Sequence, residues 1–189
     1  TLPDELFLKF IGRNQTDSDK LLVDVFGQNF VPAKFREVAD EFSADFQDKN
    51  GMPVKPGVDE IFGFCRAMDW GMGVATSTSF AEAERRLHMS QLRDRLGPLV
   101  SGDQVTNGKP NPEIYLKVAD KLDLPAESCL ALEDSYAGGT SANRAGMTVY
   151  MVPDLLPPTR EMQELAHGIF DSLNDVRLHL EERLATKAS

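Results

Sequence analysis

Residues 129–154, CLALEDSYAGGTSANRAGMTVYMVPD, decide the fold, because they contain two short apolar runs separated by one helix length. The first run extends from Cys129 to Leu132 and the second from Val149 to Val152. The segment between them, Ala137 to Ala145, is rich in small residues that let a helix pack closely on a sheet. A strand, a helix and a second strand in this order predict parallel pairing with a right-handed crossover.

The same alternation continues on both sides of this stretch. Further strands are expected at Gly73 to Thr76, Leu99 to Ser101 and Gly168 to Phe170. Further helices are expected at Val58 to Asp69, Phe80 to Leu87, Pro112 to Leu122 and Pro158 to Ala166. The predicted fold class is therefore α/β with a Rossmann-like parallel sheet, and ligands of such sheets bind at the carboxyl ends of the strands.

The first part of the chain predicts helices and no strand. The expected helices are Pro3 to Ile11, Asp17 to Phe26 with Thr16 as its cap, and Val31 to Lys49. In the last of these, apolar residues at helical spacing predict one buried stripe: Phe35, Val38, Ala39, Phe42 and Phe46. We expect a small helical-bundle cap domain over residues 1–52 and an α/β core over residues 53–189, joined at the Gly- and Pro-rich segment Asn50 to Gly57.

Composition excludes several classes of partner. The chain has 189 residues, 41% of them hydrophobic, and its 30 acidic and 20 basic residues give a net charge of −10. Sequence-independent binding to nucleic acid or to an anionic membrane surface is therefore not expected. No apolar stretch is long enough to span a bilayer, and no leader is recognised, so we expect a cytoplasmic protein, monomeric or weakly dimeric. Cys65 and Cys129 lie in apolar runs and are expected to be buried, reduced thiols.

A first polar cluster follows the predicted strand at Gly73 to Thr76. Thr76 and Ser77 precede a helix whose first amides and dipole favour an anion, so this turn is a candidate phosphate site. The alternative is that these hydroxyl side chains only cap the helix.

A second cluster surrounds Lys109. This lysine is followed by Pro110 and Pro112, which restrict the backbone while the ammonium group remains free to contact a dianion. The alternative is a solvated lysine in a turn.

A third cluster is the acidic pair Glu133 and Asp134, directly after the strand that ends at Leu132. Neighbouring carboxylates repel each other unless a cation lies nearby, and their oxygens suit Mg²⁺. Asp134 or Ser135 could equally cap the next helix, and capping is compatible with metal binding.

In order and chemistry, the three clusters resemble the second, third and fourth motifs of the haloacid-dehalogenase-like superfamily. The resemblance extends from about Pro56 to Pro153, and its specific parts are Lys109-Pro110-Asn111-Pro112, Glu133-Asp134-Ser135, Ala145-Gly146-Met147 and Val152-Pro153-Asp154. The helical region before it resembles the helical cap of the subgroup that contains β-phosphoglucomutase and phosphoglycolate phosphatase.

This resemblance implies roles for particular residues. Thr76 would hydrogen-bond the transferring phosphoryl group with help from the Ser77 amide. Lys109 would neutralise that group and the attacking carboxylate. Glu133 and Asp134 would help to hold Mg²⁺, directly or through water.

The cap would close over the substrate and exclude solvent. Gly12-Arg13-Asn14 resembles the substrate-facing loop of such caps, so Arg13 is a candidate specificity residue. The alternative for Arg13 is a surface position without a substrate role.

The nucleophile of this superfamily is the first carboxylate of an Asp-x-Asp motif at the end of a strand. Asp17-Ser18-Asp19 has the same spacing, but the polar run Gly12 to Thr16 precedes it, so it predicts the acidic first turn of a cap helix. Because Thr1 is not an initiator residue, we expect the nucleophile on a segment outside the printed chain. The printed chain is then expected to be inactive.

The resemblance therefore implies a Mg²⁺-dependent phosphomonoesterase that acts on a small phosphorylated metabolite, most simply a sugar phosphate, through an aspartyl-phosphate. Two alternatives are a mutase of the β-phosphoglucomutase type and a catalytically inactive protein that binds a phosphorylated metabolite. A haloacid dehalogenase proper is disfavoured, because halide displacement does not require the metal that the acidic pair implies.

Overall fold

The computed structural model describes residues 3–10, 15–154 and 157–187. The strands of these residues are β1 (Val74–Ala75), β2 (Leu99–Val100), β3 (Leu130–Glu133), β4 (Thr148–Met151) and β5 (Gly168–Ile169). The α-helices are α1 (Asp4–Leu8), α2 (Gln15–Phe26), α3 (Pro32–Asn50), α4 (Val58–Ala67), α5 (Phe80–Met89), α6 (Glu113–Lys121), α7 (Tyr136–Arg144), α8 (Arg160–Leu165) and α9 (Leu173–Lys187). Short 3₁₀ helices lie at Arg93–Arg95, Gly102–Gln104 and Ala126–Ser128.

All the strand pairs are parallel, which confirms the predicted fold class. The strands form a two-stranded sheet in the order β1-β2 and a three-stranded sheet in the order β3-β4-β5. In the larger sheet Leu132 pairs with Tyr150, and Tyr150 pairs in turn with Gly168. The carboxyl ends of β1 and β3 lie close together, because the Lys109 ammonium contacts both Ala75 and Glu133.

Helices cover the two sides of these strands. The larger apolar cluster contains residues of α6 and α7 packed on β2, β3 and β4, including Val100, Ile114, Val118, Ala131, Ala142 and Val149. The second cluster joins α4 and α9 to β4 through Ile61, Tyr150, Val152, Val176 and Leu180. The sequence did not predict α9, since its apolar positions, such as the fully buried Val176, are interspersed with as many charged ones.

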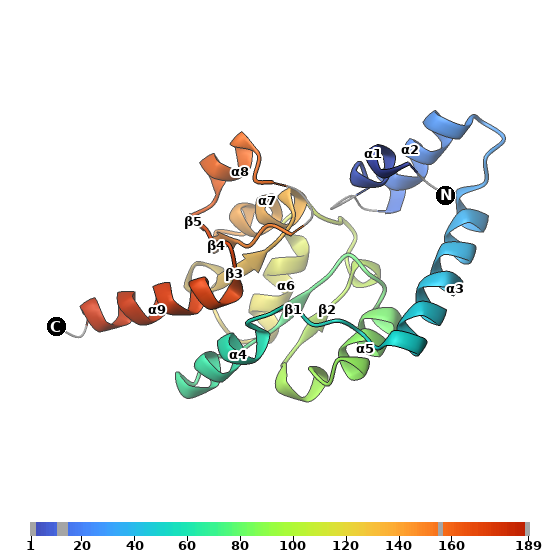
Figure 1. The fold of residues 1–189 in the computed structure, drawn as a ribbon. Helices are drawn as coiled ribbons and strands as arrows, with labels where there is room; N and C mark the ends of the chain where they lie inside the picture. Colours follow the sequence, from blue (N-terminus) through green and yellow to red (C-terminus); the bar gives the residue numbers. More distant parts are fainter. Residues whose placement is uncertain (1–2, 11–14, 155–156, 188–189) are drawn as a thin grey trace.

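The helices α1 and α2 lie apart from the body that contains the strands, and α3 extends from them to α5 (Figure 1). Two details of their prediction are wrong. Thr16 is the second residue of α2 and not its cap, since the helix begins at Gln15. The stripe on α3 is not buried: the exposed fractions are 65% for Val38, 73% for Phe42 and 55% for Phe46.

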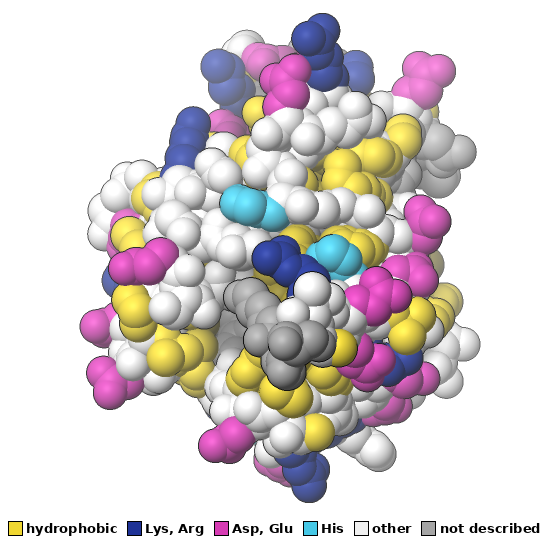
Figure 2. Space-filling view, turned by 90° about the vertical axis from the view of Figure 1, so that its left-hand side faces the viewer, with side chains coloured by type: hydrophobic (Ala, Val, Ile, Leu, Met, Phe, Trp, Pro, Cys, Tyr) yellow, Lys and Arg dark blue, Asp and Glu magenta, His cyan; other side chains and the backbone are white. Residues whose placement is uncertain are grey.

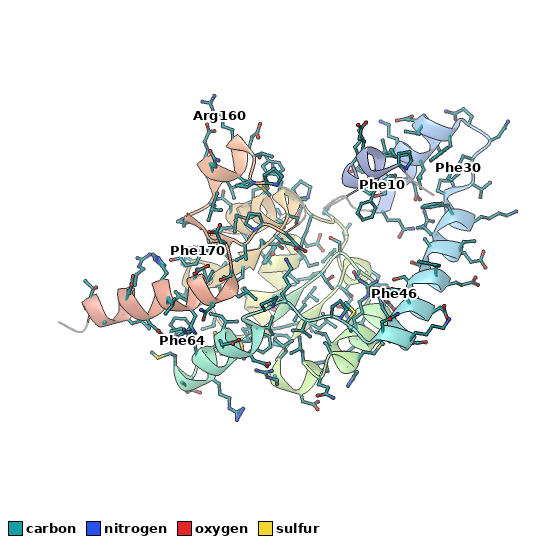
Figure 3. The ribbon with its side chains drawn as sticks, viewed as in Figure 1. Phe10, Phe30, Phe46, Phe64, Arg160 and Phe170 are labelled. Carbon is teal, nitrogen blue, oxygen red and sulfur yellow. The ribbon has the colours of Figure 1, made fainter. Side chains whose placement is uncertain are left out.

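Most of the stripe is exposed, because α3 contacts its neighbours mainly near its two ends. Phe30, before α3, stacks on Phe26 and packs near Phe35, and Figure 3 shows Phe30 and Phe46 at opposite ends of the helix. Near its C-terminal end, α3 buries Gln47, whose side-chain oxygen accepts a hydrogen bond from Arg85 of α5. Periodicity predicted the helix correctly, but it could not predict which side is covered.

The segment 51–55 between α3 and α4 is neither helix nor strand, in agreement with a break at this place. The division into a cap of residues 1–52 and a core of residues 53–189 stays a prediction. Cys65 and Cys129 are free thiols, as expected, but both are only half-buried, so the expectation that they are buried is wrong.

On the face that carries the C-terminal end of α9, side chains of Lys and Arg are interspersed with those of Asp and Glu (Figure 2). Within the described residues, no helix is both long enough and apolar enough to cross a membrane.

Candidate active site

A buried ion pair lies at the carboxyl ends of β1 and β3. The Lys109 ammonium is 2.5 Å from Glu133 Oε1, and the side chains are only 8% and 7% exposed. The same nitrogen donates to the Ala75 carbonyl oxygen at 3.1 Å. A buried charge requires a partner of this kind, because desolvation of an unpaired ion is costly. The structure therefore brings two of the predicted site residues, distant in sequence, into direct contact.

The loop that carries Lys109 is held by one carboxylate at the start of α6. Glu113 accepts hydrogen bonds from the Thr106 and Asn107 amides, each at 2.9 Å, and from the Lys117 ammonium at 2.9 Å. The hydrogen bond from Lys117, followed by those from the two amides, lowers the pKa of Glu113 to about 2. The Lys109–Pro110 peptide bond in this loop is cis. Glu113 thus fixes the loop from which Lys109 projects.

Glu133 is surrounded by donors from the chain. Its Oε1 atom accepts from the Tyr115 hydroxyl as well as from Lys109, and its Oε2 atom accepts from Ser135 Oγ at 3.1 Å. Ser135 also caps α7, since its Oγ accepts from the Gly138 amide at 3.1 Å. Burial, together with the charge of Glu133, raises the pKa of Tyr115, so its hydroxyl stays a donor.

Asp134 differs from Glu133, because it lies at the surface, although its carboxylate is partly desolvated. Desolvation and the adjacent charge of Glu133 raise the pKa of Asp134, and the positive charges of Lys55 and Lys109 oppose that rise. Of these two cations, Lys55 has the larger effect on the pKa of Asp134. The Lys55 ammonium also pairs with the Asp154 carboxylate at 3.0 Å. A carboxylate with a raised pKa beside a second acid favours binding of a cation.

The turn after β1 is ordered by local hydrogen bonds. Thr76 Oγ1 accepts from the Thr78 amide at 3.2 Å, and Ser77 is exposed. The first amide of α5, that of Phe80, is bound by the Asp103 carboxylate at 3.0 Å. The Asp103 carboxylate therefore already accepts a hydrogen bond from one of the amides that we expected to bind a phosphate. Thr76 directly follows Ala75, whose carbonyl contacts Lys109, so the turn lies beside the buried ion pair.

The remaining predicted positions have separate outcomes. Arg13 lies outside the described residues. Asp17 falls in the first turn of α2, as predicted for the Asp17-Ser18-Asp19 segment, and Asp19 pairs with Arg36 of α3. These carboxylates belong to the helical region and not to a strand end.

Sequence analysis missed Tyr115 and Lys55. Tyr115 occupies a buried position of α6 beside Ile114 and Val118, and a buried tyrosine hydroxyl requires a hydrogen-bond partner. That requirement was the available signal. Nothing in the Gly- and Pro-rich segment around Lys55 indicated that it would lie near Asp134.

The donor set fits Mg²⁺ in part. No group of three His, Cys, Asp or Glu side chains that could hold a metal exists among the described residues. However, Asp134 lies at the surface and its carboxylate has a raised pKa, and Mg²⁺ is commonly bound by one or two carboxylates with water and substrate oxygens. Glu133 is less available, because both of its oxygens accept from Lys109, Tyr115 or Ser135.

These features define an α/β protein with a lysine and two adjacent acids at the ends of parallel strands. The chain belongs to the haloacid dehalogenase-like hydrolases, since the model of that family matches residues 1–152. It is 36% identical over 126 residues to a phosphorylated carbohydrates phosphatase of Thermotoga maritima, with 67% of this chain and 51% of that protein covered.

Solved structures agree with this assignment. The CbbY protein of Rhodobacter sphaeroides, crystallised with phosphate, superposes with a TM-score of 0.68 and 25% identity, covering 78% of this chain and 66% of that one. A β-phosphoglucomutase of Clostridium difficile gives a TM-score of 0.82 over 99% of this chain and 83% of that one, and at 18% identity it supports the fold alone. The chain spans about half the length of the curated relatives that it matches.

Proposed function

We propose that the protein containing this chain is a Mg²⁺-dependent phosphomonoesterase that acts on a small phosphorylated carbohydrate through an aspartyl-phosphate. The observation that carries the proposal is the Lys109–Glu133 ion pair of 2.5 Å beside Asp134. A buried ammonium at the ends of parallel strands can neutralise the charge that spreads over a transferring phosphoryl group. Substrate class follows from the similarity to the phosphorylated carbohydrates phosphatase.

In this proposal each residue has a separate task. Lys109 would donate to a phosphoryl oxygen, while Thr76 and the Ser77 amide would bind a second one. Asp134 would hold Mg²⁺ directly and Glu133 would do so through water; the ion supplies further neutralisation of the phosphate charge. The phosphoryl group is transferred from one oxygen atom to another. Positioning of the reactants and neutralisation of the phosphoryl charge therefore account for most of the expected rate enhancement.

The nucleophile is proposed to be an Asp outside the 189 residues, on a strand between β1 and β3. Backbone geometry supports this position. The amides of Val74 and Thr76 bond toward β2, so the intervening Ala75 has its backbone groups on the opposite edge of β1. The carbonyl oxygens of Cys129, directly before β3, and of Glu133, at its end, accept hydrogen bonds from the amides of Thr148 and Val152 on the side of β4. A strand pairing with both open edges would end beside Lys109, which contacts both strands.

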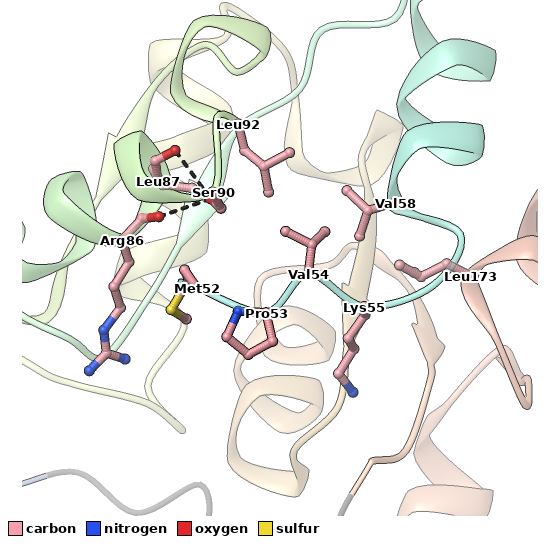
Figure 4. A pocket seen from close by; sticks show the side chains of 10 residues that line it. All are labelled: Met52, Pro53, Val54, Lys55, Val58, Arg86, Leu87, Ser90, Leu92 and Leu173. Carbon is pink, nitrogen blue, oxygen red and sulfur yellow. Dashed lines mark hydrogen bonds between the residues drawn. The ribbon is translucent and has the colours of Figure 1, made fainter. Parts of the chain in front are cut away.

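An exposed apolar residue on β3 supports the same proposal. Leu132 is 36% exposed, although the residue before it on β3, Ala131, is buried. A cavity of about 250 Å³ opens between α5 and the start of α4 (Figure 4), and its wall includes Val54, Val58, Leu87, Leu92 and Leu173. An additional strand beside β3 would cover part of Leu132, and burial of apolar surface favours its docking.

The proposal is tested with the natural full-length polypeptide and a panel of sugar and nucleotide monophosphates, with Mg²⁺ or with a chelator. We expect Mg²⁺-dependent release of inorganic phosphate from a sugar phosphate. The variant Lys109→Met should lower kcat by roughly 100-fold or more, as for loss of a group that stabilises transition-state charge. Lys121→Met, at an exposed position on α6, is the control and should leave kcat unchanged.

The outcomes separate the alternatives. Turnover that is unaffected by the chelator, or by Lys109→Met, contradicts the proposal. Transfer of phosphate to a second hydroxyl of the sugar, with little release, indicates a mutase. Saturable binding of sugar phosphates without any turnover indicates the inactive binding protein.

A further inference from the structure

The Tyr115 hydroxyl lies at the centre of the buried ion pair. It donates to Glu133 Oε1, the same atom that accepts from Lys109, and its oxygen is 3.4 Å from the Lys109 ammonium. The ammonium also lies 5.0 Å from the centroid of the Tyr115 ring. Tyr115 is 7% exposed, so solvent does not replace these contacts. One side chain therefore contacts both charged partners.

The hydrogen bonds of Lys109 are unequal. An ammonium group has three protons. Two are used in short contacts, at 2.5 Å to Glu133 Oε1 and at 3.1 Å to the Ala75 carbonyl. The third contact, to the Tyr115 oxygen, is long at 3.4 Å. Since this contact is the weakest of the three, its proton is the one that can be redirected to hydrogen-bond an incoming anion at the least cost in free energy.

The orientation of Glu133 decides where the ammonium lies. Ser135 holds Oε2, and Gly138 leaves no room for the carboxylate to move toward α7. Tyr115 holds Oε1 from the side of α6. Without the Tyr115 hydroxyl, Oε1 would keep only Lys109 as a donor, and the carboxylate could rotate together with the ammonium.

We propose that Tyr115 is a positioning residue: its hydroxyl orients Glu133 so that Lys109 is held at the end of β1 with one proton available for a phosphoryl oxygen. The use of that proton rests on the proposed function, whereas the positioning itself does not. Tyr115 would act through Glu133 and Lys109, without contact with the substrate.

The test uses Tyr115→Phe, which removes only the hydroxyl group. In ¹H–¹⁵N spectra of the lysine ammonium groups, the Lys109 signal is assigned by its loss in Lys109→Met. We expect this signal to be protected from exchange in the wild type, and to shift and exchange faster in Tyr115→Phe. Tyr150→Phe is the matched control, because Tyr150 is also buried and its hydroxyl accepts from Arg183 on α9. The control should lose a buried hydrogen bond without moving the Lys109 signal.

Kinetics provide the second measurement. In the full-length polypeptide, Tyr115→Phe should lower kcat by about tenfold with KM within about twofold, as for loss of one hydrogen bond to a charged group. Tyr150→Phe should change neither parameter. Absence of turnover in the wild type would refute the proposed function, while the spectra would still decide the role of Tyr115.

If Tyr115→Phe fails to fold, Glu133→Gln gives an independent test, because it keeps the volume but removes the charge that pairs with Lys109. The Lys109 signal should then shift in the same direction. A Lys109 signal that is unchanged in Tyr115→Phe, or that moves equally in Tyr150→Phe, overturns the proposal.

Discussion

Gly138 lies so close to the Glu133 carboxylate that a Cβ atom at residue 138 would be 2.0 Å from Oε2. The glycine is in the first turns of α7, and the carboxylate of β3 lies against its Cα atom. The contact allows the strand end and the helix to approach, and it blocks movement of the Glu133 carboxylate toward α7.

Gly138→Ala should therefore displace Glu133. We expect a loss of about 1–3 kcal/mol in the free energy of unfolding, as for overpacking of a close contact, measured in urea. Gly63→Ala on α4 is the control, because nothing lies within 4 Å of a Cβ atom there. That variant should be neutral, or more stable by up to about 1 kcal/mol, since alanine favours a helix over glycine. Equal effects of the two substitutions would contradict the contact.

Glu113 should contribute to stability in a defined range of pH. Its pKa is lowered to about 2 from 4.5 by Lys117 and the two amides, so the folded state binds its proton less tightly than the unfolded state. The stabilisation is present above pH 4.5 and is lost as the pH falls through about 2. In Glu113→Gln, the decrease in stability across this range should be shallower.

Urea unfolding at several pH values between these limits measures the effect. Asp120→Asn, at an exposed position on the same helix, is the control and should keep the wild-type slope. A wild-type slope in Glu113→Gln would show that this carboxylate does not hold the loop in solution.

The sequence predicted the core of the fold and the site better than their surroundings. Apolar runs placed both ends of all five strands of the described residues to within one position, because buried strands need continuous apolar residues. Because the predicted strands are parallel, their carboxyl ends were expected at one edge of the sheet, and Lys109 and Glu133 are in contact there. The partners of these residues were not predictable, because the contacts of Tyr115 and Lys55 depend on packing between segments distant in sequence.

The helical region shows the opposite case. Its third helix was expected from Val31 to Lys49 and extends over Pro32–Asn50, yet its apolar stripe is exposed. Helical spacing predicts an apolar side, but which neighbour covers that side is a property of the tertiary structure.

Substitution of the exposed stripe should cost little stability in the 189-residue chain. Phe42 is 73% exposed, so Phe42→Ser should change the free energy of unfolding by no more than about 0.5 kcal/mol. It should also reduce self-association, because an exposed apolar stripe favours contacts between copies. Leu22→Ala on α2 is the contrast: Leu22 is 2% exposed, and its truncation should cost about 2–5 kcal/mol.

Urea unfolding and analytical ultracentrifugation measure the two effects. A loss for Phe42→Ser as large as that for Leu22→Ala would mean that the stripe is covered in solution.

Asp134→Asn should have opposite effects on stability with and without Mg²⁺. Partial desolvation of its carboxylate and the charge of Glu133 raise the pKa of Asp134, so the folded state binds its proton more tightly than the unfolded state. Stability therefore decreases as the pH rises from the ordinary value of 3.8 through the raised pKa, and at neutral pH the carboxylate is destabilising.

With a chelator, Asp134→Asn should accordingly raise the unfolding temperature. With excess Mg²⁺, the wild type should gain stability by binding the ion and the variant should gain less. Asp171→Asn, at an exposed position between β5 and α9, should respond to Mg²⁺ as the wild type does. Equal gains in Asp134→Asn and the wild type would exclude Asp134 as a ligand of the ion.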